Sequence, residues 1–148
     1  MNPDELTAAD RADAVTLWEQ TGLTRPWNDP EADFTRAIEG TSSAVLGLRD
    51  DRGTLIGTAM VGHDGHRGWV YYLAVAPAEQ SRGHGRQLME ACERWVIARS
   101  IPKIQLMVRT GNQQVIAFYT SLGYEHQDIV VLGRRLDGNT TPSAELGR

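Results

Sequence analysis

Residues 80–86 place glycines and arginines at the start of a predicted helix. The stretch reads Gln-Ser-Arg-Gly-His-Gly-Arg and follows the apolar run Leu73–Val75. The first amides of a helix have no acceptor within it and lie at the positive end of its dipole, so they bind anions, phosphate above all. Glycines let these amides approach a phosphate, and Arg82 and Arg86 add charge-assisted contacts. The spacing predicts a phosphate site, with a glycine turn shaped only by packing as the alternative.

Two common phosphate-binding motifs do not fit this loop. No Gly-Lys-Ser/Thr ending is present, which excludes a Walker loop, and Leu88 stands where the dinucleotide fingerprint requires a third glycine. The pattern that fits is Gln80-x-x-Gly83-x-Gly85 after the strand Leu73–Val75. This combination resembles the acetyl-CoA motif of the GNAT family of N-acetyltransferases.

A second motif lies further along the chain. Residues 112–125 read NQQVIAFYTSLGYE. They are similar to a family motif in which an Asn opens a helix, an aromatic-Tyr pair follows, and Leu-Gly-Tyr/Phe ends it. The two motifs occur in the family's order, and the resemblance covers residues 6–136. The segments RPWNDP, DGHRG..YYL, PKIQ and LGYEH also resemble the YpeA-like branch of bacterial members.

The resemblance implies roles for individual residues. The backbone of the 73–75 strand would pair with the pantetheine arm of acetyl-CoA, and the Val75 N–H would donate to the oxyanion. The amides of residues 82–86 would hold the pyrophosphate. Tyr119 would protonate the leaving thiolate as the catalytic acid; a core aromatic is the alternative. The implied acetyl-CoA-binding residues are Leu73, Ala74, Val75, Gln80, Arg82, Gly83, His84, Gly85, Arg86 and Asn112.

The general base is not identified by the sequence. Many family members carry a glutamate on the strand before the glycine loop, but this strand reads GWVYYLAV and has no carboxylate. The candidates are a water held by Tyr71 or Tyr72, a residue of the following turn such as Asp64 or His66, and deprotonation of the amine before it binds. A plain hairpin turn is the favoured interpretation of Asp64.

The predicted acceptor side contains Trp27, Asp29 and Tyr72. Trp27 stands in RPWNDP, a loop that lies over the acceptor side in the fold that the resemblance implies. We interpret it as a rigid acceptor lip, with a simple connecting loop as the alternative. Carboxylates at Asp29, Glu31 and Asp33 could attract a cationic amine. An acidic first turn also complements a helix dipole, so this cluster is not specific for a ligand.

Neither the histidines nor the cysteine indicates further chemistry. His63 and His66 have no Cys or Glu partner at ligand spacing, so we predict no metal site. Cys92 lies on an apolar helical stripe, which predicts a packed thiol.

The elements that position these residues alternate between helical and strand patterns. Helices are predicted before Gly22, near 31–39, after the glycine loop and from Asn112 to Leu122. Apolar runs predict strands at 43–50, 54–62, 69–75 and 103–108, with a last strand within 125–136. Hairpins combined with crossover helices predict an α/β fold of the α+β type with a mixed sheet. The resemblance adds the GNAT fold, with about four helices and a splayed strand pair.

Composition limits the remaining possibilities. The chain has 148 residues, a formal net charge of -4 and one cysteine. One domain over residues 1–136 is expected, with a disordered tail at 137–148. The acidic balance argues against nucleic acid, and no apolar run or leader indicates a membrane or export, so a cytoplasmic protein is expected.

The activity that the resemblance implies is acetyl transfer from acetyl-CoA to a primary amine. The acceptor is a small molecule, a protein N-terminus or a lysine, and the resemblance also allows a homodimer. A CoA-binding regulatory module without catalysis is the first alternative, and a phosphate-binding or scaffold domain without CoA is the second.

Overall fold

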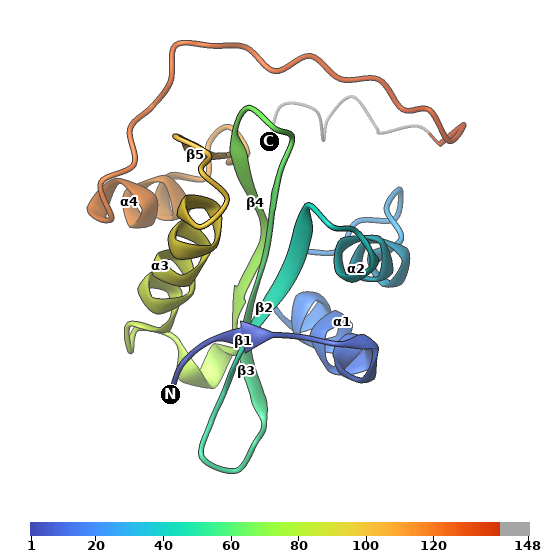
Figure 1. The fold of residues 1–148 in the computed structure, drawn as a ribbon, viewed down its shortest axis with the longest axis vertical. Helices are drawn as coiled ribbons and strands as arrows, with labels where there is room; N and C mark the ends of the chain where they lie inside the picture. Colours follow the sequence, from blue (N-terminus) through green and yellow to red (C-terminus); the bar gives the residue numbers. More distant parts are fainter. Residues whose placement is uncertain (140–148) are drawn as a thin grey trace. The chain divides into compact units, whose positions relative to one another are not determined.

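The structure is a computed structural model that describes residues 1–139. The chain forms two compact units, Met1–Leu106 and Met107–Arg148. The first unit contains a five-stranded sheet with three α-helices, and the described part of the second, residues 107–139, contains one α-helix (Figure 1). The expected mixed α/β architecture is therefore confirmed. The predicted disordered tail, 137–148, lies almost entirely outside the described residues.

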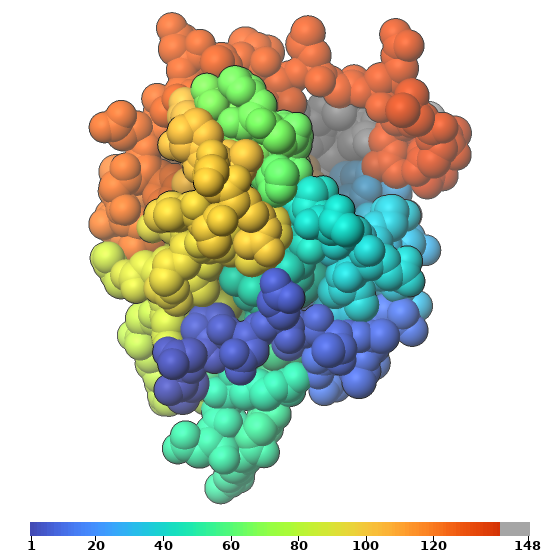
Figure 2. All heavy atoms as spheres, viewed as in Figure 1, coloured from blue at the N-terminus to red at the C-terminus, as the bar shows by residue number. Residues whose placement is uncertain are grey.

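The sheet of the first unit has the strand order β1-β2-β3-β4-β5. Its strands are β1 (Asp4–Glu5), β2 (Ser43–Arg49), β3 (Leu55–His63), β4 (Gly68–Val75) and β5 (Ile104–Leu106). The first four strands pair antiparallel in chain order, whereas β4 and β5 pair parallel. Parallel neighbours need a long crossover, and the helix after the glycine loop supplies it. The turn between β2 and β3 projects from the first unit in Figure 2.

Three α-helices cover the sheet. They are α1 (Arg11–Gln20), α2 (Pro30–Glu39) and α3 (His84–Ile97). Helices α1 and α2 lie on one face and α3 on the other (Figure 1). Asp29 caps α2 by accepting a hydrogen bond from the Ala32 amide at 3.1 Å, and Pro30 occupies the first helical position. The predicted apolar stripe of α3 is buried, namely Leu88, Met89, Cys92, Trp95 and Val96.

The core between α1, α2 and the sheet is built around Trp18 and Phe34, both fully buried. Their rings lie 6.1 Å apart at a tilt of 50°. Truncating either ring to alanine would leave a cavity, a change that typically costs about 3–5 kcal/mol. This core joins α1 and α2 to the strand that precedes the glycine loop, because Ala74 of β4 belongs to the same buried cluster.

In the second unit, α4 (Gln113–Ser121) begins and ends as the sequence predicts. The Asn112 carboxamide caps it by accepting from the Val115 amide at 3.3 Å. At the other end Gly123 has φ 94°, and the Tyr124 amide donates to the Tyr119 carbonyl at 3.1 Å. A left-handed glycine followed by an apolar residue is a common helix stop.

The strand predicted within 125–136 is wrong, because these residues have no strand structure. Ile129, Val130, Val131 and Leu132 are all more than 60% exposed. Apolar character is a local property, but a strand forms only where another strand supplies hydrogen-bond partners. The strand predicted at 103–108 is also shorter than expected, since β5 has three residues.

Within the described part of the chain, no helix combines the length and apolar character needed to cross a membrane.

Candidate functional site

The glycine loop begins α3 with an unusual backbone. Gly83 is the N-cap residue with φ 84°, in the left-handed region that glycine adopts without strain, and Ser81 has φ 65°. Gly83 has no side chain to accept hydrogen bonds from the first turn, and the first helical bond there joins the Gln87 amide to the Gly83 carbonyl. A Cβ built at Gly83 would meet nothing within 4 Å. The first turn of α3 therefore receives no hydrogen bond from a cap side chain, and an added Cβ at Gly83 would meet no neighbouring atom, both of which suit an anion site.

The charged side chains of this loop are already partly paired. Arg82 donates to the Glu79 carboxylate at 3.1 Å, and the His84 Nε2 lies 3.7 Å from the same oxygen. Arg86, at the start of α3, has an exposed side chain. Two of the predicted anion contacts therefore surround an internal carboxylate, which an incoming phosphate would have to displace.

Beyond Val70, the edge of β4 that faces β5 has no paired strand among residues 1–139. The β4–β5 ladder stops at the Val70–Leu106 pair, while β4 continues to Val75. The ladder ends where β5 ends, at Leu106, and the splay of this strand pair stays a prediction. On the opposite side the Ala76 amide bonds to the Ile56 carbonyl at 2.8 Å. Because alternate residues of a strand turn their backbone groups to opposite sides, the N–H and C=O of Val75 face the open edge.

Gln80 contacts this open edge. Its side-chain amide donates to the Val75 carbonyl at 3.1 Å. Leu73 and Ala74 continue the strand, with Ala74 buried and paired to Thr58. The predicted strand residues and the glycine loop are thus brought together, with Gln80 as the link between them.

A β-bulge interrupts β4 just before these residues. Met60 pairs with Tyr71 and Thr58 with Ala74, so Ala59 of β3 lies opposite both Tyr72 and Leu73. Tyr72 has φ 51°, one of three non-glycine residues with positive φ in the described chain. An extra residue in one strand bends it and re-aims its backbone groups. The bulge therefore controls the direction of the open edge at Val75.

The phenol of Tyr72 is tied to α2. Its hydroxyl donates to Asp33 Oδ2 at 2.7 Å, and Arg36 Nη2 donates to Asp33 Oδ1 at 2.5 Å. Burial raises the pKa of Tyr72, and the hydrogen bond to Asp33 raises it further, so the phenol stays neutral. The sequence placed both residues on the predicted acceptor side but contained no signal that they touch, because 39 positions separate them.

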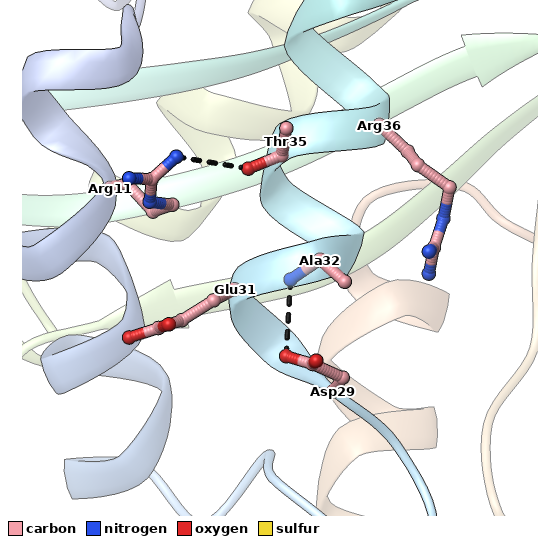
Figure 3. Close-up of a pocket in the computed structure, with 6 residues that line it drawn as sticks. All are labelled: Arg11, Asp29, Glu31, Ala32, Thr35 and Arg36. Atoms are coloured by element: carbon pink, nitrogen blue, oxygen red, sulfur yellow. Dashed lines mark hydrogen bonds between the residues drawn. The ribbon is translucent and has the colours of Figure 1, made fainter.

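The other predicted acceptor residues lie at the N-terminal end of α2. Asp29 is its N-cap residue, and Trp27 is half-buried in the turn before it, where the Asn28 amide donates to the Arg25 carbonyl at 3.0 Å. Asp29 also borders an open hollow of about 460 Å³ between α1 and α2 (Figure 3). Its lining residues are Arg11, Asp29, Glu31, Ala32, Thr35 and Arg36. Arg11 donates to Thr35 Oγ1 there at 3.0 Å, so this hollow joins two helices and does not include the glycine loop.

The turn at Asp64 has a structural role. The Asp64 carboxylate accepts from the His66 and Arg67 amides at 2.9 and 2.8 Å and from Trp69 Nε1 at 3.1 Å. These bonds, led by the Arg67 amide, lower the pKa of Asp64 to about 2, which makes it a poor proton acceptor. The structure thus favours the hairpin-turn interpretation over a general base. Across the described residues, no group of three or more His, Cys, Asp or Glu side chains could hold a metal.

Cys92 is fully buried on α3, and burial raises the pKa of its thiol to about 12. A thiol that stays protonated is a poor nucleophile, which agrees with its predicted packing role.

Tyr119 lies on α4 in the second unit, and Asn112 is the N-cap residue of that helix. Asn112 uses its side chain to cap the helix, and Tyr119 is buried. The Tyr119 ring makes edge-to-face contacts with Phe118 at 5.0 Å and with Tyr124 at 5.8 Å between centroids. These contacts involve the ring alone, so they would hold a phenylalanine in the same way.

Comparison with known proteins supports a single family. Residues 12–124 match the acetyltransferase (GNAT) family. AAC(6')-Iy, solved with the bisubstrate analog CoA-S-monomethyl-acetylneamine, has a TM-score of 0.77 and 19% identity over 90% of this chain and 97% of its own. The aminoglycoside 6'-N-acetyltransferase AAC(6')-IG from Acinetobacter haemolyticus gives 0.74 and 19% over 93% and 100%. The ribosomal-protein-S18-alanine N-acetyltransferase from Escherichia coli gives 0.71 and 25% over 82% and 76%.

Proposed function

The chain belongs to the GNAT family of acetyltransferases, and we propose that it moves an acetyl group from acetyl-CoA directly to a primary amine. The observation that carries the proposal is the glycine loop of the first unit, where Gly83 opens α3 beside the unpaired edge of β4. A diphosphate needs N–H donors, and an extended amide-containing arm needs a strand edge. The loop and the edge provide both within one unit.

The proposed binding mode uses backbone groups for the most part. The amides of residues 84–86 hold the pyrophosphate, with Arg82 and Arg86 as additional donors. The arm of acetyl-CoA pairs with the backbone from Leu73 to Val75, in the manner of peptide addition to an open sheet edge. Asn112 is proposed to contact the same arm. Acetyl-CoA supplies an activated acetyl thioester.

Direct transfer forms a C–N bond as the C–S bond breaks. The amine nitrogen attacks the thioester carbonyl, the Val75 N–H donates to the oxyanion, and the CoA thiolate leaves with a proton from Tyr119. An amine of pKa about 10.4 is mostly protonated at pH 7, so its neutral form costs roughly 4.6 kcal/mol. Desolvation near the Trp27 loop and a water held by Tyr71 or Tyr72 are the proposed means of removing that proton.

Two kinds of amine acceptor enter the proposal. The neighbours named above are acetyltransferases of aminoglycosides and of a ribosomal protein's alanine, so both small molecules and protein N-termini enter the proposal. The YpeA-like placement, a cytoplasmic location and a homodimer remain proposals from the sequence. A catalytically inactive CoA-binding module is the second candidate, because β4 carries no carboxylate.

Turnover separates these two functions. Release of the CoA thiol from acetyl-CoA is measured with a panel of aminoglycosides, polyamines and peptides that differ in their N-terminal residue. Thiol release that depends on an amine, with an acetylated product in the mass spectrum, supports the transferase. Acetyl-CoA binding by calorimetry without turnover on any amine would favour the regulatory module.

Removing the Glu79 carboxylate should strengthen acetyl-CoA binding. In Glu79→Gln, Arg82 and His84 lose their internal anion and are free to meet the phosphates. Exposed ion pairs contribute about 0.2–1 kcal/mol, so the dissociation constant should fall about 1.5- to 5-fold. Calorimetry at low and high salt measures it, and the gain should shrink as salt screens the loop.

Glu90→Gln provides the matched control, since Glu90 is an exposed carboxylate of α3 beyond its first turn. It makes the same change in net charge and should leave affinity unchanged. An equal gain in both variants would mean that net charge alone, and not the Glu79 pairing, limits binding.

Trp27→Ala tests the predicted acceptor lip. If the indole lines the amine site, the acceptor KM should rise about tenfold, as expected for about 1.4 kcal/mol of lost apolar contact, while acetyl-CoA affinity stays the same. Steady-state kinetics and a melting curve are needed together. A lower melting temperature with an unchanged acceptor KM would make Trp27 purely structural.

A further inference from the structure

Tyr72 is held by three separate elements of the first unit. Asp33 of α2 accepts from its hydroxyl at 2.7 Å, and the Thr58 hydroxyl of β3 donates to its carbonyl at 3.1 Å. Trp18 of α1 stacks on its ring with centroids 3.9 Å apart and planes 13° from parallel. These contacts restrain the hydroxyl, the carbonyl and the ring of Tyr72 at the same time.

The contacts form one connected chain of polar groups. Trp18 Nε1 donates to Thr58 Oγ1 at 2.8 Å, and the Thr58 hydroxyl in turn donates to the Tyr72 carbonyl. Trp18 and Thr58 are fully buried, and Thr58 is the one polar residue in the buried set of the described chain. A buried polar group is costly unless it is hydrogen-bonded. The Thr58 hydroxyl makes both of these hydrogen bonds, which a valine of similar shape could not make.

Tyr72, the residue held by these contacts, also has a strained backbone conformation. Tyr72 adopts φ 51° in the β4 bulge, a conformation that a bulky L-residue adopts only where its surroundings hold it. Three residues later Val75 turns its N–H to the open edge. A release of Tyr72 toward extended backbone would remove the bulge and reverse which backbone groups face that edge.

We propose that Asp33 is a positioning residue that acts through Tyr72, holding the β4 bulge so that the Val75 N–H points at the thioester carbonyl. The inference rests on the proposed function and adds a residue to it. It also gives α2, on the face of the sheet opposite α3, a direct part in setting the reaction geometry. Asp33 itself touches neither acetyl-CoA nor the reacting atoms in this proposal.

The test is the carbonyl stretch of [1-13C]acetyl-CoA bound to the whole protein, which needs no acceptor. A hydrogen bond from a fixed donor polarises the carbonyl and lowers its frequency relative to free acetyl-CoA. In Asp33→Ala and Tyr72→Phe this shift should be largely lost, while acetyl-CoA affinity changes less than about threefold because the phosphate contacts remain. Tyr72→Phe keeps the ring that stacks on Trp18.

Asp33→Asn separates the hydrogen bond from the charge. The carboxamide oxygen can still accept from the Tyr72 hydroxyl, so the carbonyl shift should be restored. Arg36→Ala removes the ion pair to Asp33 and should leave the shift intact, as should Glu39→Ala, an exposed carboxylate change at the far end of α2.

On an amine that the protein acetylates, kcat should fall about tenfold in Asp33→Ala with little change in KM, because a misplaced oxyanion donor loses part of the 10²–10³-fold that such a donor contributes.

The outcomes are distinct. A wild-type protein that does not bind acetyl-CoA overturns the proposed function and this inference with it. Binding with a carbonyl shift that all variants retain overturns the inference alone. A shift lost in Asp33→Ala and not restored in Asp33→Asn, in step with a lower melting temperature, assigns Asp33 to stability and also overturns it.

Discussion

Gly85→Asp is expected to abolish acetyl-CoA binding without lowering the melting temperature. Gly85 is the second residue of α3 and, unlike Gly83, has no positive φ, so any L-residue can adopt its backbone conformation. A carboxylate in the first turn of a helix interacts favourably with the dipole by about 0.3–1 kcal/mol, and aspartate also has a better helix propensity than glycine. The same carboxylate would stand where the proposed pyrophosphate binds and would repel it.

The expected loss of affinity is at least about 100-fold, because hydrogen bonds to a charged group contribute about 1.5–3 kcal/mol each and more than one would be lost. Calorimetry measures the affinity directly. In a melting experiment the wild-type protein gains about 2.7 kcal/mol of stability when acetyl-CoA is present at 100 times its dissociation constant, and at the same concentration the variant should gain about 0.4 kcal/mol or less.

Gly85→Asn separates charge from bulk, since asparagine has the shape of aspartate without the charge. It should weaken binding less than the aspartate does. Unchanged affinity in Gly85→Asp would show that acetyl-CoA does not lie against the first turn of α3.

Tyr119→Phe is expected to lower kcat by about 10²–10⁴-fold, the usual contribution of a general acid, with little change in either KM. The substitution removes one hydroxyl. It keeps the ring and therefore the edge-to-face contacts with Phe118 and Tyr124. If the phenol protonates the thiolate, the substitution removes an interaction that is made in the transition state, and the fall in kcat measures it. The melting temperature should show that α4 is intact.

Two comparisons make this result specific. Tyr124→Phe removes the hydroxyl of the neighbouring tyrosine and should leave turnover within about threefold of wild type, as for a residue outside the catalytic step. A thioester analogue whose thiol leaves readily as an anion should restore much of the rate of Tyr119→Phe. Equal turnover by wild type and Tyr119→Phe would mean that water or the attacking amine supplies the proton to the thiolate. Tyr119 would then be a residue that only orders the acetyl-CoA arm.

The sequence by itself determined the features that depend on a few neighbouring residues. Asn112 caps α4 as the sequence predicts, because a cap is decided by the first turn of its own helix. Asp29, which the sequence analysis placed on the acceptor side, caps α2 for the same reason. Gly83 opens α3 in a left-handed conformation for the same local reason. The order of the elements from α1 to α4, and hence the mixed sheet, also followed from apolar periodicity and turn residues.

Local patterns failed where a distant partner decides the outcome. The apolar residues of 125–136 have strand character, yet no strand forms there, because hydrogen-bond pairing with another strand is required and composition cannot supply it. The β4–β5 ladder stops at Val70 although both apolar runs continue past it. No property of residues 71–75 read alone indicates which of their backbone groups stay unpaired.

The contacts that hold Tyr72 were determined by tertiary structure alone. The sequence placed Tyr72 in an ordinary strand and Asp33 in an acidic first turn. Only folding brings the hydroxyl of one within 2.7 Å of the carboxylate of the other, 39 residues away, while Thr58 and Trp18 hold the same residue from β3 and α1. A tyrosine with positive φ is unfavourable in isolation, so its conformation results from packing between elements and could not be predicted from propensity.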